Sequence, residues 1–346
     1  MKKKILVVTP IEDQNFTWVA EGELRERYDW IFINLGDMNR RSWRIVFDGF
    51  MVRQKKEYDL VISMDYYLTI GLALRKFFFG GIKNHFSYGF NKSRDSFFER
   101  QRLVRVFLSR VLRRCDCFVV HSISEAKIFS GYFNLPEDRF LFRHWGADLP
   151  VYTEEGRLRE KFSITGDFVC AIGRNNRDYE LLFRAVKDLD VSVVVVAPDY
   201  ALAGLNVPCN VKVLSGLTMS DSLGLINASM VNIVPIKDAT RGAGHMTVVF
   251  AMHMGKPQII TDVNTIRDYF TPEQVVSVEH GSVLELSRAI KRLANDSAAR
   301  EVLGESSVVF SEQWMSSASV GRAVMNILRS WEAGGKSDFL PAGFCS

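Results

Sequence analysis

The sequence predicts an α/β protein made of two doubly wound domains, each a parallel sheet with helices on both faces. Three observations lead to this prediction. Short strand-forming runs alternate with helix-forming segments along the chain. A polar, glycine-containing segment near residues 148–165 interrupts this alternation, which then starts again. With 346 residues, 47% of them hydrophobic, the chain is long enough to bury two cores.

The first half of the chain, residues 1–150, contains five short runs rich in β-branched and aromatic residues. Runs of this kind predict strands. A segment with helical spacing, near residues 96–114, separates the last two. The runs are KILVVTP at 4–10, YDWIFINL at 28–35, YDLVISMD at 58–65, IKNHFSYG at 82–89 and DCFVVHS at 116–122.

The second half, residues 151–315, repeats the alternation and predicts a second sheet. Helix-forming segments lie at 178–188 and 221–228. The run at 191–198 is almost entirely apolar, as expected for a strand that helices cover on both faces. The predicted strands are FVCAIG at 168–173, VSVVVVAP at 191–198, VKVLSG at 211–216, VNIVPI at 231–236 and QIITD at 258–262.

The composition favours a cytoplasmic protein without a metal site. No run of 18 or more apolar residues is present, and the basic start at residues 1–4 leads directly into a strand-like run without the pattern of a signal peptide. The five cysteines are scattered, without the spacing of metal ligands or of a disulfide framework. We therefore expect reduced thiols, no bound metal and no cofactor.

The first candidate site follows the predicted strand at 168–173. Gly173 permits a tight turn there, and Asp178 can cap the next helix, whose first amides would face an anion. Arg174 and Arg177 add two positive charges suited to a pyrophosphate. The alternative is that both arginines solvate the loop and pair with Asp178 or Glu180.

The second candidate site lies in TRGAGHMTVVFAMHMGKPQIITD, residues 240–262. Gly242 and Gly244 let the backbone approach a ligand closely, and a helix expected to begin near Thr247 presents its amides to an anion. Thr247 or His245 can add a side-chain hydrogen bond. Gly255 ends the helix before the next strand. This order of loop, helix and strand predicts an anion site.

Together these motifs resemble the donor domain of glycosyltransferase family 4, the retaining nucleotide-sugar transferases of GT-B fold. The resemblance rests on GRNNRDYELLFRA, VKVLSGLTMSDSLGLINASMVNIVPI, GAGHMTVVFAMHMGKPQIITD and VEHGSVLELSRAIKRLANDSAAREVLGE. The run from Cys115 to Leu149 is similar to the end of that family's first domain. The resemblance covers roughly residues 55–310 and implies two Rossmann-like domains facing a cleft, with a last helix near residues 316–332 that crosses back to the first domain.

The resemblance also implies site residues. Gly173, Arg174 and Arg177 would hold the diphosphate, Leu217 would meet the base, and the backbone from Gly244 through His245 and Met246 to Thr247 would meet the sugar and phosphate. The family places two glutamates in the second motif, and this chain has Gly242 and Phe250 there. A family histidine near the donor sugar corresponds to either His85 or Tyr88. Both are alternatively ordinary strand residues.

The function expected is transfer of a sugar from a UDP- or GDP-linked donor, with retention, to a lipid-linked or oligosaccharide acceptor in polysaccharide biosynthesis. Arg174 and Arg177 would stabilise the departing diphosphate, without a protein nucleophile or a metal. Asp65, at a strand end, could orient the acceptor or act as a base, or only cap the next helix. Because the two glutamates are missing, a catalytically silent nucleotide-sugar-binding scaffold is an alternative. A nucleotide-sugar epimerase of the same fold is another.

The charge is concentrated in one segment. Residues 75–114 contain eleven Lys and Arg residues and two acidic ones, a net charge of +9 in a chain of net charge +4. Phenylalanines at 77–79, 97 and 98 interleave with them. This mixture suits an anionic membrane surface, and would attach the protein to the inner face of a membrane. In the helix expected there, Val104, Phe107, Leu108 and Val111 would share one face, opposite Arg102, Arg105 and Arg113. The alternative is an ordinary amphipathic helix with its basic face in water. We expect no nucleic-acid partner, because no binding motif accompanies the charge.

Overall fold

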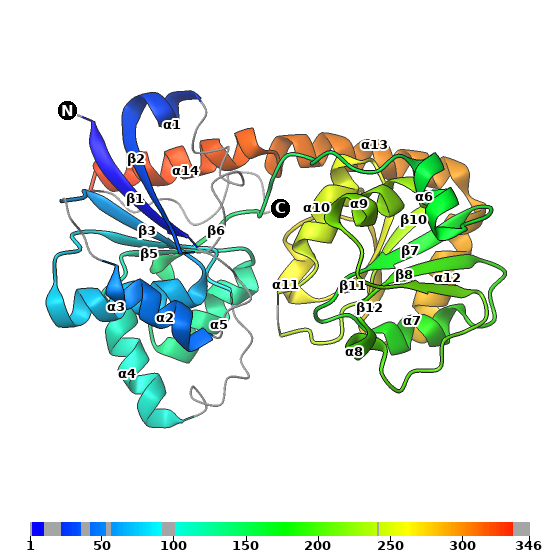
Figure 1. Ribbon diagram of the computed structural model, residues 1–346, viewed down its shortest axis with the longest axis horizontal. Helices are drawn as coiled ribbons and strands as arrows, with labels where there is room; N and C mark the ends of the chain where they lie inside the picture. The colour runs from blue at the N-terminus through cyan, green and yellow to red at the C-terminus, as the bar shows by residue number, and fades with distance from the viewer. Residues whose placement is uncertain are drawn as a thin grey trace. The chain divides into compact units, whose positions relative to one another are not determined.

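The computed structural model describes residues 2–9, 22–35, 42–52, 57–91, 101–240 and 242–334. The chain divides into two compact units, drawn in Figure 1. Unit 1 contains Met1–His144 and Ser317–Ser346, and unit 2 contains Trp145–Ser316. Each unit has one six-stranded parallel sheet with helices on both faces. The predicted fold class, two doubly wound α/β domains, is confirmed.

The sheet of unit 1 has the strand order β2-β1-β3-β4-β5-β6. Each of the five predicted runs overlaps one of its strands, and the sixth, β6, has only three residues and was not predicted. The strands are β1 (Lys3–Thr9), β2 (Tyr28–Asn34), β3 (Leu60–Met64), β4 (His85–Tyr88), β5 (Cys117–Val120) and β6 (Phe140–Phe142).

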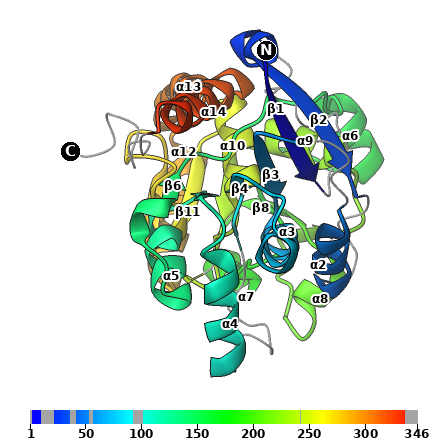
Figure 2. The same ribbon diagram turned by 90° about the vertical axis from the view of Figure 1, so that its left-hand side faces the viewer.

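Helices from both ends of the chain cover the unit 1 sheet. On one face α14 packs Val320, Val324 and Leu328, spaced four residues apart, against the strands. Helices from the first half of the chain, among them α3, α4 and α5, cover the other face. Figure 2 shows these layers from the side of unit 1. The helices are α1 (Gly22–Arg27), α2 (Ser42–Met51), α3 (Tyr66–Phe79), α4 (Arg102–Leu112), α5 (Ile123–Phe133), the 3₁₀ turn η3 (Glu137–Arg139) and α14 (Ser317–Glu332).

The sheet of unit 2 has the order β12-β11-β10-β7-β8-β9. The chain therefore builds outward from β7 in one direction and from its neighbour β10 in the other. In such sheets ligands bind beyond the carboxyl ends of the two strands where the order reverses. The strands are β7 (Phe168–Ile172), β8 (Ser192–Val196), β9 (Val211–Leu214), β10 (Val231–Val234), β11 (Gln258–Asp262) and β12 (Val276–Glu279), of which β12 was not predicted.

The helices of unit 2 follow the capping signals of the sequence. The Asp178 carboxylate accepts a hydrogen bond from the Leu181 amide (2.9 Å) and caps α7, as predicted. Helix α10 begins at His245, two residues before the predicted start, and Gly255 follows its end. The helices are α6 (Glu155–Phe162), α7 (Tyr179–Val186), α8 (Asp199–Leu202), α9 (Met219–Ala228), α10 (His245–His253), α11 (Asn264–Arg267), α12 (Val283–Asn295) and α13 (Ser297–Trp314).

Candidate functional site

A pocket of about 630 Å³ lies in unit 2 at the carboxyl ends of β7 and β10, where the strand order reverses. Because parallel strands end at the same edge, both candidate motifs reach this pocket. It also contains residues that no sequence pattern marked, among them Asn175, Tyr200 and Ser222. The predicted residues that line it are Gly173, Arg174, Arg177, Leu217, Gly242, Gly244, Met246 and Thr247.

Arg177 is the central cation of this pocket. Its guanidinium donates Nη1 to the Asn175 carbonyl (3.0 Å) and Nη2 to the Thr247 hydroxyl (3.3 Å). Its Nε is buried and has no hydrogen-bond partner. Burial lowers the pKa of Arg177 from its ordinary value. Pairing with Asp178 or Glu180, the alternative considered from the sequence, is not observed, since neither carboxylate forms an ion pair with Arg177 within the described chain.

The loop that carries Arg177 is tied to the neighbouring loop after β10. The Asp178 amide donates to the Pro235 carbonyl (2.9 Å), and the Asn176 side chain exchanges hydrogen bonds with the backbone of Asp238 (2.8 and 3.0 Å). The Tyr179 hydroxyl donates to the Gly173 carbonyl. These contacts hold the loop in place before any ligand arrives, which lowers the entropy cost of binding.

Gly173 leaves the space that the Arg177 side chain occupies. A Cβ at this position would lie 2.6 Å from the Arg177 Nε and 2.8 Å from its Cζ. No Cβ tolerates contacts this short, so a larger residue would displace the guanidinium. The glycine is therefore required for the position of Arg177, which adds to the turn geometry that the sequence suggested.

The start of α10 faces the same pocket. Gly244 has a left-handed φ of 92°, and a Cβ there would lie 3.0 Å from Val234 Cγ1, so glycine fits the turn best. No side chain caps this helix start. The first amides of an α-helix lack intrahelical partners and carry partial positive charge. Together with Arg177 they give one wall of the pocket a positive potential.

Another part of the pocket lining is apolar. Leu217, Leu223, Ile226 and Phe250 lie there, and the pocket lining within the described chain contains no Asp, Glu or His residue. Phe250 has only 3% of its surface exposed and packs edge-on against Trp145, at 5.7 Å between ring centroids. The pocket thus combines cationic groups with hydrophobic side chains.

His245 is the predicted unit 2 residue that does not line the pocket. Its ring stacks on Tyr269 at 4.4 Å between centroids, and its Nε2 lies 3.1 Å from the Thr265 carbonyl. The next two residues of α10, Met246 and Thr247, do line the pocket. The helical turn of about 100° per residue therefore directs His245 into the interior of unit 2.

In unit 1, Asp65 follows β3 and caps α3. Its carboxylate accepts a hydrogen bond from the Tyr67 amide (2.6 Å). Burial raises the pKa of Asp65. Its φ of 93° is unusual for a residue with a side chain. The capping role considered from the sequence is therefore observed.

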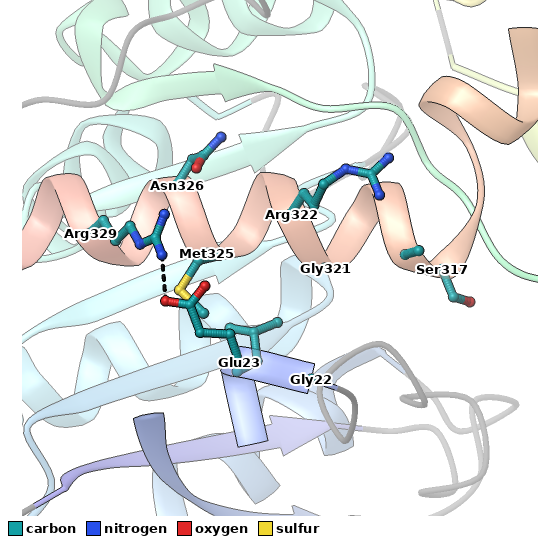
Figure 3. A pocket seen from close by; sticks show the side chains of 10 residues that line it. Gly22, Glu23, Ser317, Gly321, Arg322, Met325, Asn326 and Arg329 are labelled. Atoms are coloured by element: carbon teal, nitrogen blue, oxygen red, sulfur yellow. Dashed lines mark hydrogen bonds and ion pairs between the residues drawn. The ribbon is translucent and has the colours of Figure 1, made fainter. Parts of the chain in front are cut away.

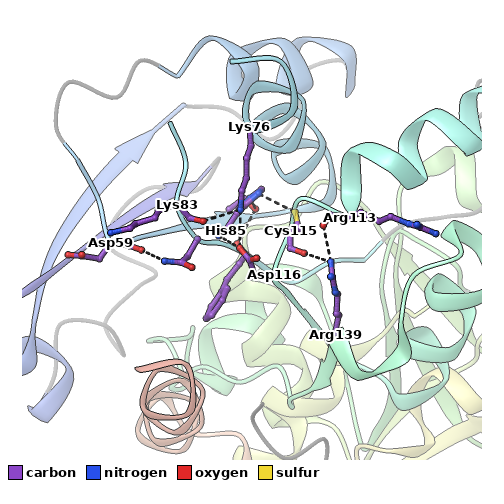
Figure 4. Close-up of polar contacts among 11 residues, drawn as sticks. Asp59, Lys76, Lys83, His85, Arg113, Cys115, Asp116 and Arg139 are labelled. Carbon is purple, nitrogen blue, oxygen red and sulfur yellow. Dashed lines mark hydrogen bonds and ion pairs between the residues drawn. The ribbon is translucent and has the colours of Figure 1, made fainter. Parts of the chain in front are cut away.

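His85 lies inside unit 1 with none of its surface exposed (Figure 4). Its Nε2 is 2.9 Å from the Ser63 Oγ, and its Nδ1 is 3.1 Å from the Cys115 Sγ. Burial lowers the pKa of His85 to about 3. Tyr88, at the end of β4, is half-buried, and its ring packs edge-on against His121. His85 is therefore a core histidine, and of the two candidates only Tyr88 retains exposed surface.

A second pocket, of about 550 Å³, lies between α1 and α14 in unit 1 (Figure 3). Arg329 forms an ion pair with Glu23 across it. No sequence motif lies there, and its lining carries both signs of charge.

No helix in the described part of the chain is long and apolar enough to cross a membrane. Over the same residues, no three His, Cys, Asp or Glu side chains gather in a way that could hold a metal.

Solved structures with the same architecture include enzymes that act on sugars. Sucrose-phosphate synthase from Thermosynechococcus elongatus superposes with a TM-score of 0.71 at 15% identity, over 96% of this chain and 100% of the other. HepE of Anabaena, crystallised with UDP-glucose, gives 0.72 at 15%, over 94% and 99%. A Listeria monocytogenes protein assigned as a UDP-N-acetylglucosamine 2-epimerase gives 0.61 at 10%, over 99% and 100%. No protein-family model matches the chain, and no curated protein matches its sequence.

These similarities show that the chain has the GT-B fold of nucleotide-sugar glycosyltransferases, as the sequence motifs predicted. At such low identity they show the fold alone, so the function is argued from the pocket.

Proposed function

We propose that the chain is a glycosyltransferase that binds a UDP- or GDP-linked sugar in the unit 2 pocket. It transfers the sugar, with retention of anomeric configuration, to a glycan or lipid-linked acceptor. The observation that carries the proposal is Arg177. A guanidinium with a buried, unpartnered Nε faces the uncapped start of α10 in a pocket whose described lining contains no carboxylate.

The positive charge of Arg177 and the partial positive charge of the α10 amides repel each other. A bound anion between them would remove this repulsion. A diphosphate is suited to this place because its oxygens can accept hydrogen bonds from both Arg177 and the helix amides. Arg174, exposed at the rim of the same pocket, adds a second cation. The apolar wall around Leu217 and Phe250 would take the nucleoside. In this proposal guanidinium groups and helix amides meet the diphosphate charge, so that no metal is required.

The same groups supply the catalysis. Breaking a sugar–diphosphate bond places negative charge on the departing phosphate, and fixed positive groups stabilise that charge in the transition state. The motif resemblance to glycosyltransferase family 4 and the superposition on HepE, crystallised with UDP-glucose, both support this assignment.

A second candidate is a nucleotide-sugar-binding protein without turnover. It is favoured by Gly242 and Phe250, which leave the pocket without the two carboxylates of the resembling family. An epimerase is less well supported, because such chemistry needs acid and base groups, and the described pocket lining provides neither Asp, Glu nor His.

The test is a calorimetric panel of UDP, GDP, ADP and CMP with the purified chain, followed by incubation with the sugar donors of the tightest binder. Binding of one nucleoside diphosphate with release of sugar supports the transferase, and NMR of the anomeric proton of a transfer product reports retention or inversion. Binding without release identifies the silent binding protein. No binding of any nucleotide overturns both.

A further inference from the structure

Helices α2, α3 and α4 of unit 1 expose large apolar side chains together. In the part of the chain that the structure describes, sixteen large hydrophobic residues are exposed, and eight of them belong to these three helices. On α2, Trp43, Phe47 and Met51 are 59%, 54% and 47% exposed. Spaced four residues apart, they form one stripe along the helix. The helix packs on α3 through the opposite side, where Gly49 and Gly71 allow close approach.

The stripe continues onto α3 and α4. Phe78 and Phe79, at the end of α3, are exposed, and the Phe79 ring lies 5.6 Å from that of Phe50 on α2. On α4, Leu103 and Phe107 are 83% and 40% exposed. The Phe77 ring of α3 lies 6.2 Å from that of Phe107, which joins the two helices. We call the exposed faces of α2 and α4 and the end of α3 the three-helix surface.

Helix α4 does not separate its apolar and basic residues as the sequence predicted. Phe107, expected on one face with Leu108 and Val111, is exposed although those two residues are buried. Arg105, expected on the basic face, is half-buried over the Tyr132 ring at 5.4 Å. Arg102 and Arg110 are exposed to solvent, as are their neighbours on α4, Leu103 and Phe107. An ordinary amphipathic helix with only its basic face in water would bury Leu103 and Phe107. That alternative therefore does not account for the exposed apolar residues of α4.

The three-helix surface is also cationic. Arg44, Arg102, Arg110, Arg113 and Arg114 are exposed. No acidic partner for any of them is found over the described residues. Lys76 does not contribute, because it forms an ion pair with Asp116 at 3.0 Å. Residues 92–100 of the predicted basic segment, which include Lys92, Arg94, Arg100, Phe97 and Phe98 and both of its acidic residues, lie outside the described residues.

We propose that the three-helix surface docks the protein on a bilayer that contains anionic lipid. Arginines alternating with exposed aromatic and aliphatic side chains fit the boundary where phosphate headgroups meet acyl chains. The phosphates match the cationic charge, and the acyl chains cover the apolar residues. The inference goes beyond the proposed function and stands on different residues from those of the nucleotide pocket.

The test is co-sedimentation with vesicles of phosphatidylcholine alone and of phosphatidylcholine mixed with phosphatidylglycerol. The protein should pellet with the mixed vesicles at low salt and much less with phosphatidylcholine. R102Q/R110Q/R113Q should weaken anionic binding about a hundredfold, since each basic residue near the surface contributes on the order of a factor of five. W43S/F47S should weaken the binding that remains at high salt, because salt does not screen apolar contacts.

Two control variants carry matched changes on exposed positions of unit 2. R288Q/K291Q/R292Q removes three exposed charges from α12, and V302S/V309S removes two exposed apolar side chains from α13. Both should pellet as the native chain does. The midpoint of thermal unfolding, measured by circular dichroism, reports whether each variant is folded. Equal pelleting with both vesicle types overturns the proposal, as does native-like pelleting of both surface variants. A dimer in sedimentation velocity that W43S/F47S dissociates would instead identify the surface as a contact between two copies.

Discussion

Units 1 and 2 are built on similar sheets, yet the ends of their strands are used differently. In unit 2 the loops after β7 and β10 leave the guanidinium of Arg177 and the start of α10 open to a pocket. In unit 1 the carboxylate of Asp65, which directly follows β3, is occupied by the Tyr67 amide at the start of α3. The fold alone therefore does not make a site. A binding site also needs polar groups that the protein itself leaves without a partner.

The difference extends to the outer surfaces. On the faces of α2 and α4 in unit 1, Arg44, Arg102 and Arg110 are exposed among exposed aromatic residues and form no ion pair within the described chain. We therefore expect nucleotide binding and membrane binding to be separable by mutation.

The largest effect is expected from Gly173→Ala. The new Cβ would lie within 3 Å of the Arg177 guanidinium and displace it, so UDP affinity should fall tenfold or more. Isothermal titration measures this, with Gly156→Ala as the control, because a Cβ at Gly156 meets nothing within 4 Å. Native affinity in a folded Gly173→Ala protein would show that the position of Arg177 does not matter.

A pH effect should report the buried histidine of unit 1. The pKa of His85 is about 3 when folded and near 6.5 when unfolded, so only the unfolded chain takes up the proton between these values. The free energy of unfolding should therefore fall as pH drops from 6.5, by up to about 1.4 kcal/mol per pH unit from this residue. His121, whose pKa burial also lowers, adds to the slope.

Hydrogen exchange of β4 peptides, corrected for intrinsic rates, measures this slope. His85→Gln should flatten it between pH 6.5 and 5, whereas a glutamine at the exposed His280 should leave it unchanged. Identical slopes in the native chain and His85→Gln would mean that the buried histidine does not resist protonation.

A smaller effect is expected from the sugar of the nucleotide. Since Phe250 and its apolar neighbours offer no carboxylate to the ribose hydroxyls, UDP and its 2′-deoxy form should bind within about threefold of each other. Competition titration compares them. A preference for UDP of a hundredfold or more would reveal a hydroxyl-binding group that this pocket lining does not explain.

No effect is expected from metal removal. Guanidinium groups and helix amides meet the diphosphate in this account, so EDTA should leave UDP affinity unchanged. The titration is repeated with EDTA and with added Mg²⁺. A UDP affinity that depends strongly on Mg²⁺ would contradict the proposal that the diphosphate binds without a metal.

The strand order along the chain and the pocket in unit 2 were largely predictable from sequence. Apolar runs such as residues 191–198 mark buried parallel strands, and the carboxyl ends of such strands share one edge. These two rules predicted that Gly173, Arg177 and Gly244 lie close together. Strand β6 was missed because three residues give no pattern, and β12 because most of its residues are partly exposed.

The side-chain directions were less predictable. His245 is turned away from the pocket because α10 begins two residues earlier than the capping pattern suggested. The burial of His85 depends on which face of β4 the helices cover, which periodicity over four residues does not reveal. The exposure of Phe107 follows from how α4 packs on α3 and α5. Each of these outcomes is set by tertiary packing.

The central claim is that Arg177 binds the diphosphate of a nucleotide in unit 2. It is tested most directly by isothermal titration of UDP and GDP into the native chain, Arg177→Ala and Arg184→Ala, the last removing an exposed arginine of α7 that lies outside the pocket lining. One nucleotide should bind the native chain and Arg184→Ala equally and bind Arg177→Ala at least tenfold more weakly, because a charge-assisted contact contributes roughly 1.5–3 kcal/mol. Equal affinity in all three proteins, with Arg177→Ala folded, would contradict the account.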